Sequence, residues 1–130
     1  MNPVAAICVA ALGLLLFGLG LGTSINRKKA RRSYGCADDP ASPLYKFMRA
    51  HGNTAEYAPF FAVLMLFLGT RDPAPWVVWT MVAATACRYI FVAGLVAYPS
   101  MARPNALRFI GGLGTYVTGL VLSAAVLFSV

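Results

Sequence analysis

Long apolar runs make up most of the chain, and short polar segments separate them. Four stretches reach or approach the roughly 20 residues that a helix needs to cross a bilayer. The pattern predicts helices at about residues 3–30, 44–69, 75–98 and 106–130. The links between them are too short to hold a soluble domain. We therefore expect an all-α integral membrane protein, with residues 1–130 forming a single bundle of four transmembrane helices.

The polar segments contain residues that commonly start and end helices. Pro43 is well placed to open the second predicted helix, and Asn105 is suited to cap the fourth. The first apolar stretch lacks a positive n-region and a small-residue cleavage site, and the basic run NRKKARR follows it. We expect a retained transmembrane helix there and not a signal peptide.

Composition agrees with a membrane protein, because 59% of the residues are hydrophobic and only 12% are charged. The net charge of +7 is unevenly placed. Basic residues gather between the first and second helices and again near the third link, while the second link has only Arg71, beside Asp72. This distribution predicts that the first and third links are cytoplasmic and that both termini lie outside. The basic residues between the first and second helices are Arg27, Lys28, Lys29, Arg31, Arg32 and Lys46.

The chain has three cysteines, and no pair of them has metal-ligand spacing. Cys8 and Cys87 fall within predicted helices, and Cys36 falls in the first link. We expect three free thiols and no metal site.

Small residues recur every four positions in two of the predicted helices. Gly18 and Gly22 have this spacing in the first helix. In lipid, such faces allow helix backbones to approach closely. An oligomer is expected as well, because four helices alone bury few polar groups. The set in the fourth helix is Gly111, Thr115, Gly119 and Ser123.

The segment RAHGNTAEYAPFF, residues 49–61, places polar side chains at the start of an otherwise apolar helix. At about 100° per residue, Arg49, Asn53, Glu56 and Tyr57 fall within an arc of about 100° over two turns. His51 falls on the opposite side. This polar stripe begins at the predicted cytoplasmic end of the second helix.

A carboxylate inside a membrane costs several kcal/mol unless it is paired or faces a water-filled cavity. Arg88, in the middle of the third helix, is the natural partner of Glu56. We expect an internal Glu56–Arg88 ion pair, and a carboxylate held in this way can still accept a ligand's ammonium group.

The stripe suits a small zwitterion with excess negative charge. Arg49 offers a fork for a carboxylate, and Asn53 offers both a donor and an acceptor. We expect Arg27, Lys28 and Arg108 to reach the same cytoplasmic mouth from neighbouring helices. Glutathione has the required groups, although an acidic lipid headgroup would satisfy several of the same residues.

These residues resemble the second-helix signature of the membrane-associated proteins in eicosanoid and glutathione metabolism (MAPEG). The resemblance follows Arg49-Ala50, Asn53, Glu56-Tyr57 and Pro59-Phe60, and it is strongest to the leukotriene C synthase and prostaglandin E synthase branches. The run RKKA at residues 27–30 and ALRFIGG at residues 106–112 are similar to the end of helix one and the start of helix four there.

The resemblance implies a homotrimer with glutathione, as co-substrate, bound between neighbouring subunits near the cytoplasmic face. It implies a glutathione transferase, with peroxidase activity as a second expectation, acting on lipophilic small molecules that arrive from membrane lipid. Arg27 and Arg108 would then be catalytic, near the thiol. The residues implied to bind glutathione are Arg49, Asn53, Glu56, Tyr57, Lys28 and Arg88.

Some positions depart from the family pattern and leave alternatives open. Phe91 and Leu95 stand where relatives have tyrosines, and Lys29 stands at the position of an activating arginine. Arg103 is an alternative to Arg108. The alternative hypothesis for the function is a non-catalytic lipid-binding membrane protein of the same fold. A small drug exporter is disfavoured, because the first helix has no charge before Arg27.

Overall fold

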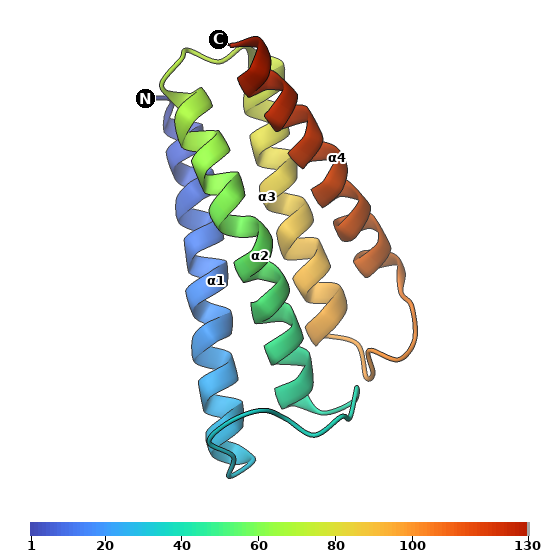
Figure 1. Ribbon diagram of the computed structural model, residues 1–130. Helices are drawn as coiled ribbons and strands as arrows, with labels where there is room; N and C mark the ends of the chain where they lie inside the picture. Colours follow the sequence, from blue (N-terminus) through green and yellow to red (C-terminus); the bar gives the residue numbers. More distant parts are fainter. Residues whose placement is uncertain (130) are drawn as a thin grey trace.

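The computed structural model describes residues 1–129, which form four helices joined by short links (Figure 1). Both ends of the chain lie at the same end of the bundle (Figure 1). The all-helical, four-helix expectation is confirmed. The predicted end of the fourth helix, residue 130, lies outside the described residues. The helices are α1 (Pro3–Lys29), α2 (Pro43–Gly69), α3 (Pro75–Val96) and α4 (Ala106–Phe128).

Local sequence explains where the helices begin. A proline opens α1, α2 and α3, where its missing N–H would have no helical partner. The Asn2 side chain accepts a hydrogen bond from the Val4 amide at 2.9 Å. Asn105 likewise accepts from the Arg108 amide at 2.9 Å, which confirms its predicted capping role.

Three of the helices, α1, α3 and α4, are long and apolar enough to cross a membrane. The α2 helix is not in this set, although its length of 27 residues equals that of α1. Its N-terminal half contains Lys46, Arg49, His51 and Glu56, and its C-terminal half is apolar. The bundle thus combines three apolar spans with one helix of mixed character.

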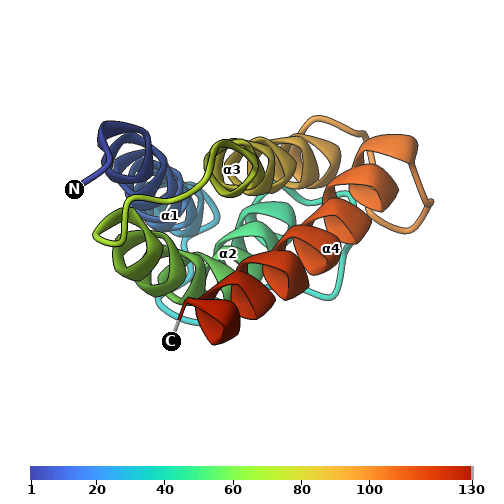
Figure 2. The ribbon, with the colours of Figure 1, turned by 90° about the horizontal axis from the view of Figure 1, so that it is seen from above.

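The α2 helix contacts all three other helices, whereas α1 and α4 do not touch within residues 1–129. The view from above shows α1 and α4 on opposite sides of α2 and α3 (Figure 2). Leu12, Met65, Met81 and Leu122 are fully buried in the main apolar core. A polar residue on α2 can therefore meet α1, α3 or α4, depending on the side of the helix on which it lies.

The α3 and α4 backbones pack closely, and glycine permits this contact. An alanine Cβ at position 111 would lie 2.7 Å from Phe91 Cα, and one at position 94 would lie 2.7 Å from the Arg108 amide nitrogen. In α1, a side chain at Gly22 would collide with the Phe47 ring, while Gly18 borders open space. The predicted close packing is confirmed at Gly111 and Gly22 and is absent at Gly18 within the described chain.

Three hydrogen bonds join α2 and the first link to the end of α3 and the third link at the basic end of the bundle. Lys46 Nζ donates to the carbonyl oxygens of Val96 at 3.2 Å and Tyr98 at 2.9 Å. The Met101 amide donates to the Pro40 carbonyl at 2.9 Å. Lys46, which the sequence analysis counts among the basic residues that predict topology, therefore also binds carbonyl groups at the end of α3.

Candidate functional site

A buried arginine joins three helices in the middle of the bundle. Arg88 is only 1% exposed. Its Nη2 donates to Asn53 Oδ1 at 2.7 Å and to Thr54 Oγ1 at 3.4 Å, both on α2. Its Nη1 donates to Thr115 Oγ1 on α4 at 3.4 Å. Arg88 thereby links α3 to both neighbouring helices.

Two aromatic rings complete the surroundings of Arg88. The guanidinium carbon lies 5.2 Å from the ring centroid of Tyr57 and 5.2 Å from that of Phe91. Both distances are within the range of cation–π attraction. Arg88 Nε is buried and has no hydrogen-bond partner within the described chain. The cation is thus held by neutral groups and keeps one unused donor.

The expected Glu56–Arg88 ion pair is wrong. The hydrogen bonds of Arg88 go to Asn53, Thr54 and Thr115, and the Glu56 side chain is exposed. The physical reason is the direction of the side chain. The arginine contacts α2 at Asn53, Thr54 and Tyr57, on either side of Glu56 along the helix, whereas the Glu56 side chain is exposed.

The remaining members of the polar stripe border this cluster. Arg49 and Glu56 are exposed, whereas Asn53 and Tyr57 are half-buried. The α2 helix therefore presents two opposite charges on its surface beside a buried, donor-rich centre. Charges exposed on a membrane helix are costly unless a polar partner or water meets them.

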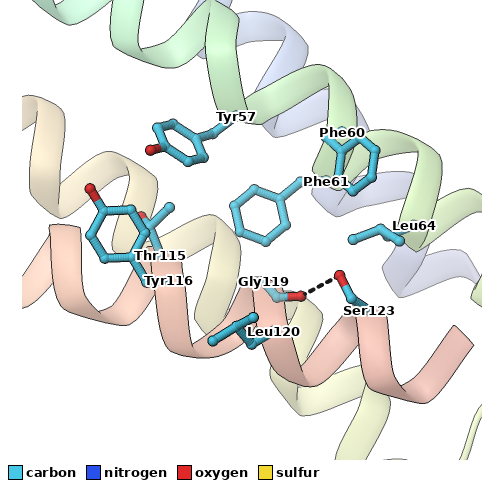
Figure 3. Close-up of a pocket in the computed structure, with 9 residues that line it drawn as sticks. All are labelled: Tyr57, Phe60, Phe61, Leu64, Thr115, Tyr116, Gly119, Leu120 and Ser123. Atoms are coloured by element: carbon cyan, nitrogen blue, oxygen red, sulfur yellow. Dashed lines mark hydrogen bonds between the residues drawn. The ribbon is translucent and has the colours of Figure 1, made fainter. Parts of the chain in front are cut away.

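Beyond Tyr57 the polar stripe gives way to an apolar groove between α2 and α4 (Figure 3). Its volume is about 280 Å³. Figure 3 shows Tyr57 and Tyr116 at one end of this groove, and their ring centroids lie 6.0 Å apart in an edge-to-face arrangement. Ser123 Oγ donates to the Gly119 carbonyl at 2.8 Å, so this hydroxyl is already satisfied. The lining residues are Tyr57, Phe60, Phe61, Leu64, Thr115, Tyr116, Gly119, Leu120 and Ser123.

A second, more polar cavity of about 410 Å³ lies between α1 and α2. Arg27 lines it, with one guanidinium nitrogen 3.9 Å from Met48 Sδ and with a buried Nε that has no partner in the described chain. His51 also lines it, packed against Gly20. This cavity opens on the α1 side of α2, away from Asn53 and Arg88. Within one protomer Arg27 therefore does not reach the polar stripe.

The other predicted cations are placed differently again. Arg108 donates to the carbonyl oxygens of Met101 at 2.8 Å and Arg103 at 3.3 Å, so it holds the link between α3 and α4. Arg103 and Lys28 are exposed. Within residues 1–129, Arg27 and Arg108 lie at different places from Arg49, so the expected convergence of Arg27, Lys28 and Arg108 on one mouth stays a prediction for neighbouring subunits.

The family model described as the MAPEG family matches residues 5–128. The chain belongs to the MAPEG family. This assignment agrees with the resemblance noted from residues 49–61, and it makes the chain a multi-pass membrane protein.

Two curated relatives of this MAPEG protein are the inner membrane protein YecN of Escherichia coli K12 and that of E. coli O6:H1. Each is 35% identical over 75 residues, which is 58% of this chain and 56% of YecN. The match thus spans just over half the length of these relatives. No solved structure matches the chain.

Sequence reasoning missed several residues around the centre of this MAPEG protein. Thr54 and Phe91 contact Arg88, yet neither was given a role there. From the sequence, Thr115 is placed only on a small-residue face. Its hydroxyl group, in an otherwise apolar helix, was the signal for the buried polar contact that the structure has there. His51 was placed correctly on the side of α2 opposite Arg49, but its shared cavity with Arg27 was not foreseen.

Proposed function

We propose that this MAPEG protein is a membrane-bound glutathione-dependent transferase that conjugates lipophilic electrophiles or reduces lipophilic peroxides. One observation carries the proposal. The exposed Arg49 and Glu56 flank the Arg88 centre, and the same surface continues at Tyr57 into an apolar groove. The thiolate of glutathione and a lipophilic acceptor would therefore lie side by side.

The charges of the stripe match the groups of glutathione. The Arg49 guanidinium is suited to a carboxylate, and the exposed Glu56 carboxylate is suited to the ammonium group. Since Glu56 is not neutralised by Arg88, its full charge is available to a ligand. Exposed charge pairs of this kind contribute more to the orientation of the peptide and to specificity than to affinity.

A cation beside the thiol would favour the thiolate, which is the nucleophile. Arg27 has an unpartnered, buried Nε, whereas Arg108 donates to link carbonyls. This difference favours Arg27 as the catalytic group, with Arg108 holding the adjacent link. In the conjugation reaction the sulfur forms a bond to the electrophilic carbon, and the leaving group departs with its bonding electrons.

We further propose that the protein is a homotrimer with its sites between neighbours. Arg27 and His51 face away from Asn53 and Arg88 in one protomer, so a single chain cannot surround one ligand with both sets. A neighbouring copy would bring its Arg27 side against the polar stripe. Cyclic assemblies join two different surfaces in this way.

The direct test mixes purified protein with glutathione and 1-chloro-2,4-dinitrobenzene. Thiolate absorbance and formation of the conjugate are followed spectrophotometrically. We expect a saturable thiolate signal and a conjugation rate that saturates with glutathione. Absence of both the thiolate signal and saturable binding would contradict the proposed function.

The alternative is a non-catalytic, lipid-binding MAPEG protein. The apolar groove, together with Phe91 and Leu95 where relatives have tyrosines, is the observation in its favour. This alternative predicts that a fluorescent fatty acid binds and is displaced by lipid, while glutathione produces no thiolate signal. The two functions are therefore separated by one titration with glutathione.

We also propose that the basic links face the cytoplasm, following the charge distribution. Cys36 lies in the first link, whereas Cys8 and Cys87 lie within helices. A membrane-impermeant maleimide should leave Cys36 unlabelled in intact cells and label it in inverted vesicles. Labelling in intact cells would reverse the orientation.

A further inference from the structure

The hydrogen bond between Arg88 and Asn53 determines which way the Asn53 amide points. A guanidinium group has only donors. Arg88 Nη2 lies 2.7 Å from the Asn53 side chain, so the atom facing it must be the carbonyl oxygen Oδ1. The amide nitrogen Nδ2 is consequently turned away from Arg88.

The Asn53 Nδ2 group remains free for another molecule. It makes no hydrogen bond within residues 1–129, and the buried side-chain atoms without a partner in that range are Arg27 Nε and Arg88 Nε. Asn53 is half-buried, so its amide N–H groups reach the surface between Arg49 and Glu56. The stripe therefore presents a donor at its centre.

We propose that Arg88 is a positioning residue that makes Asn53 a donor-only contact, so that the ligand group bound at Asn53 is a carboxylate or carbonyl oxygen. This inference rests on the proposed function and deepens it. Arg88 is 1% exposed and is covered by the Tyr57 and Phe91 rings. It acts on the ligand through Asn53 and not by direct contact.

The fixed amide gives the site its polarity. An asparagine that is free to turn can accept from an ammonium group as well as donate to a carboxylate. Because Arg88 holds Oδ1 on its own side, an ammonium group that arrives from the surface would meet the Nδ2 donor and would be disfavoured. The ligand amine is thereby directed to Glu56, one turn further along α2, and an acceptor oxygen is directed to Asn53.

The contact itself is tested without ligand, by a double-mutant cycle on thermal unfolding of the full-length protein in detergent. The variants are Arg88→Met, Asn53→Leu and the double variant. We expect Asn53→Leu to destabilise the Arg88→Met protein much less than it destabilises the natural protein, because Arg88→Met has already removed the shared hydrogen bond. Strictly additive shifts in melting temperature would overturn the positioning role.

The polarity is tested with Asn53→Asp, which keeps an acceptor for Arg88 and removes the donor. The melting temperature should be retained or raised, while the dissociation constant for glutathione rises at least about tenfold. Thr118→Val is the matched control, since it removes a buried hydroxyl that donates only to carbonyl groups of α4 and leaves Arg88 and Asn53 unchanged. Its dissociation constant should stay within about twofold.

Glutathione binding by Asn53→Asp within twofold of the natural protein would overturn the donor-only assignment, even if Arg88→Met does not fold. If the natural protein binds no glutathione, the proposed function fails and the ligand assignment fails with it. The unfolding cycle still decides whether Arg88 holds Asn53.

Discussion

At the scale of single residues, the central feature is a buried cation, Arg88, that has no carboxylate partner among residues 1–129. Placing a charged side chain inside a membrane bundle costs several kcal/mol. Arg88 offsets this cost with three hydrogen bonds to neutral oxygens and with two aromatic rings. Glu56 consequently lies on the surface and does not pair with Arg88.

This arrangement predicts the behaviour of Glu56→Gln. Because Glu56 does not pair with Arg88, the variant should keep its free energy of unfolding within about 0.5 kcal/mol. The dissociation constant for glutathione should rise about tenfold or more, since a charged hydrogen bond to the amine is lost. Thermal unfolding and equilibrium binding measure the two effects separately. A destabilised variant with unchanged affinity would restore the ion pair and remove Glu56 from the site.

At the scale of helices, α2 consists of two chemically different halves. Its first half contains the charged stripe, and its second half packs Phe61, Leu64 and Met65 into the apolar core. The polar half of α2 packs against α3 and α4, and these two helices lie close together where Gly111 meets Phe91. The position of the stripe therefore depends in part on this glycine contact between α3 and α4.

Two adjacent glycines of α4 provide a matched test of this contact. An alanine Cβ at position 111 would lie 2.5 Å from the Phe91 amide nitrogen, whereas one at position 112 would lie 3.6 Å from the Phe91 ring. Gly111→Ala should destabilise the protein by about 1–3 kcal/mol through overpacking. Gly112→Ala should be neutral or stabilising, because alanine favours helix by up to about 1 kcal/mol over glycine. Equal stabilities in denaturant unfolding would contradict the close packing of α3 on α4.

At the scale of the whole molecule, α2 divides the protomer into two surfaces. The Arg27 cavity opens on one side, and the polar stripe with its apolar groove lies on the other. The cavity on the first side is lined by one cation, Arg27, and by no acidic residue of the described chain, whereas the second side has Arg49 and Glu56 exposed beside the apolar groove.

Mixed trimers distinguish sites between subunits from sites within one. Arg27→Met and Arg49→Met should each abolish most conjugation, since each removes one half of every site. When the two variants are co-expressed, about a quarter of the sites between neighbours should regain both arginines. Conjugation of 1-chloro-2,4-dinitrobenzene measures the recovery. Activity no higher than that of the single variants would place both arginines on the same protomer's site.

The linear order of residues by itself determined the helices and their ends. A run of apolar residues long enough to span lipid, a proline at the first helical position and a capping asparagine such as Asn105 act locally, so they could be predicted without a fold. The family signature at residues 49–61 was also readable, because it is a contiguous pattern on one helix.

Only the tertiary structure decided which polar groups meet. Arg88 bonds to Asn53 and not to Glu56, Arg108 binds link carbonyls, and Arg27 faces away from the stripe. These outcomes depend on how each helix is rotated about its axis and how far it is shifted along its neighbour. A shift of one residue turns a side chain by about 100° and moves it about 1.5 Å, and spacing within one helix contains no information about that offset.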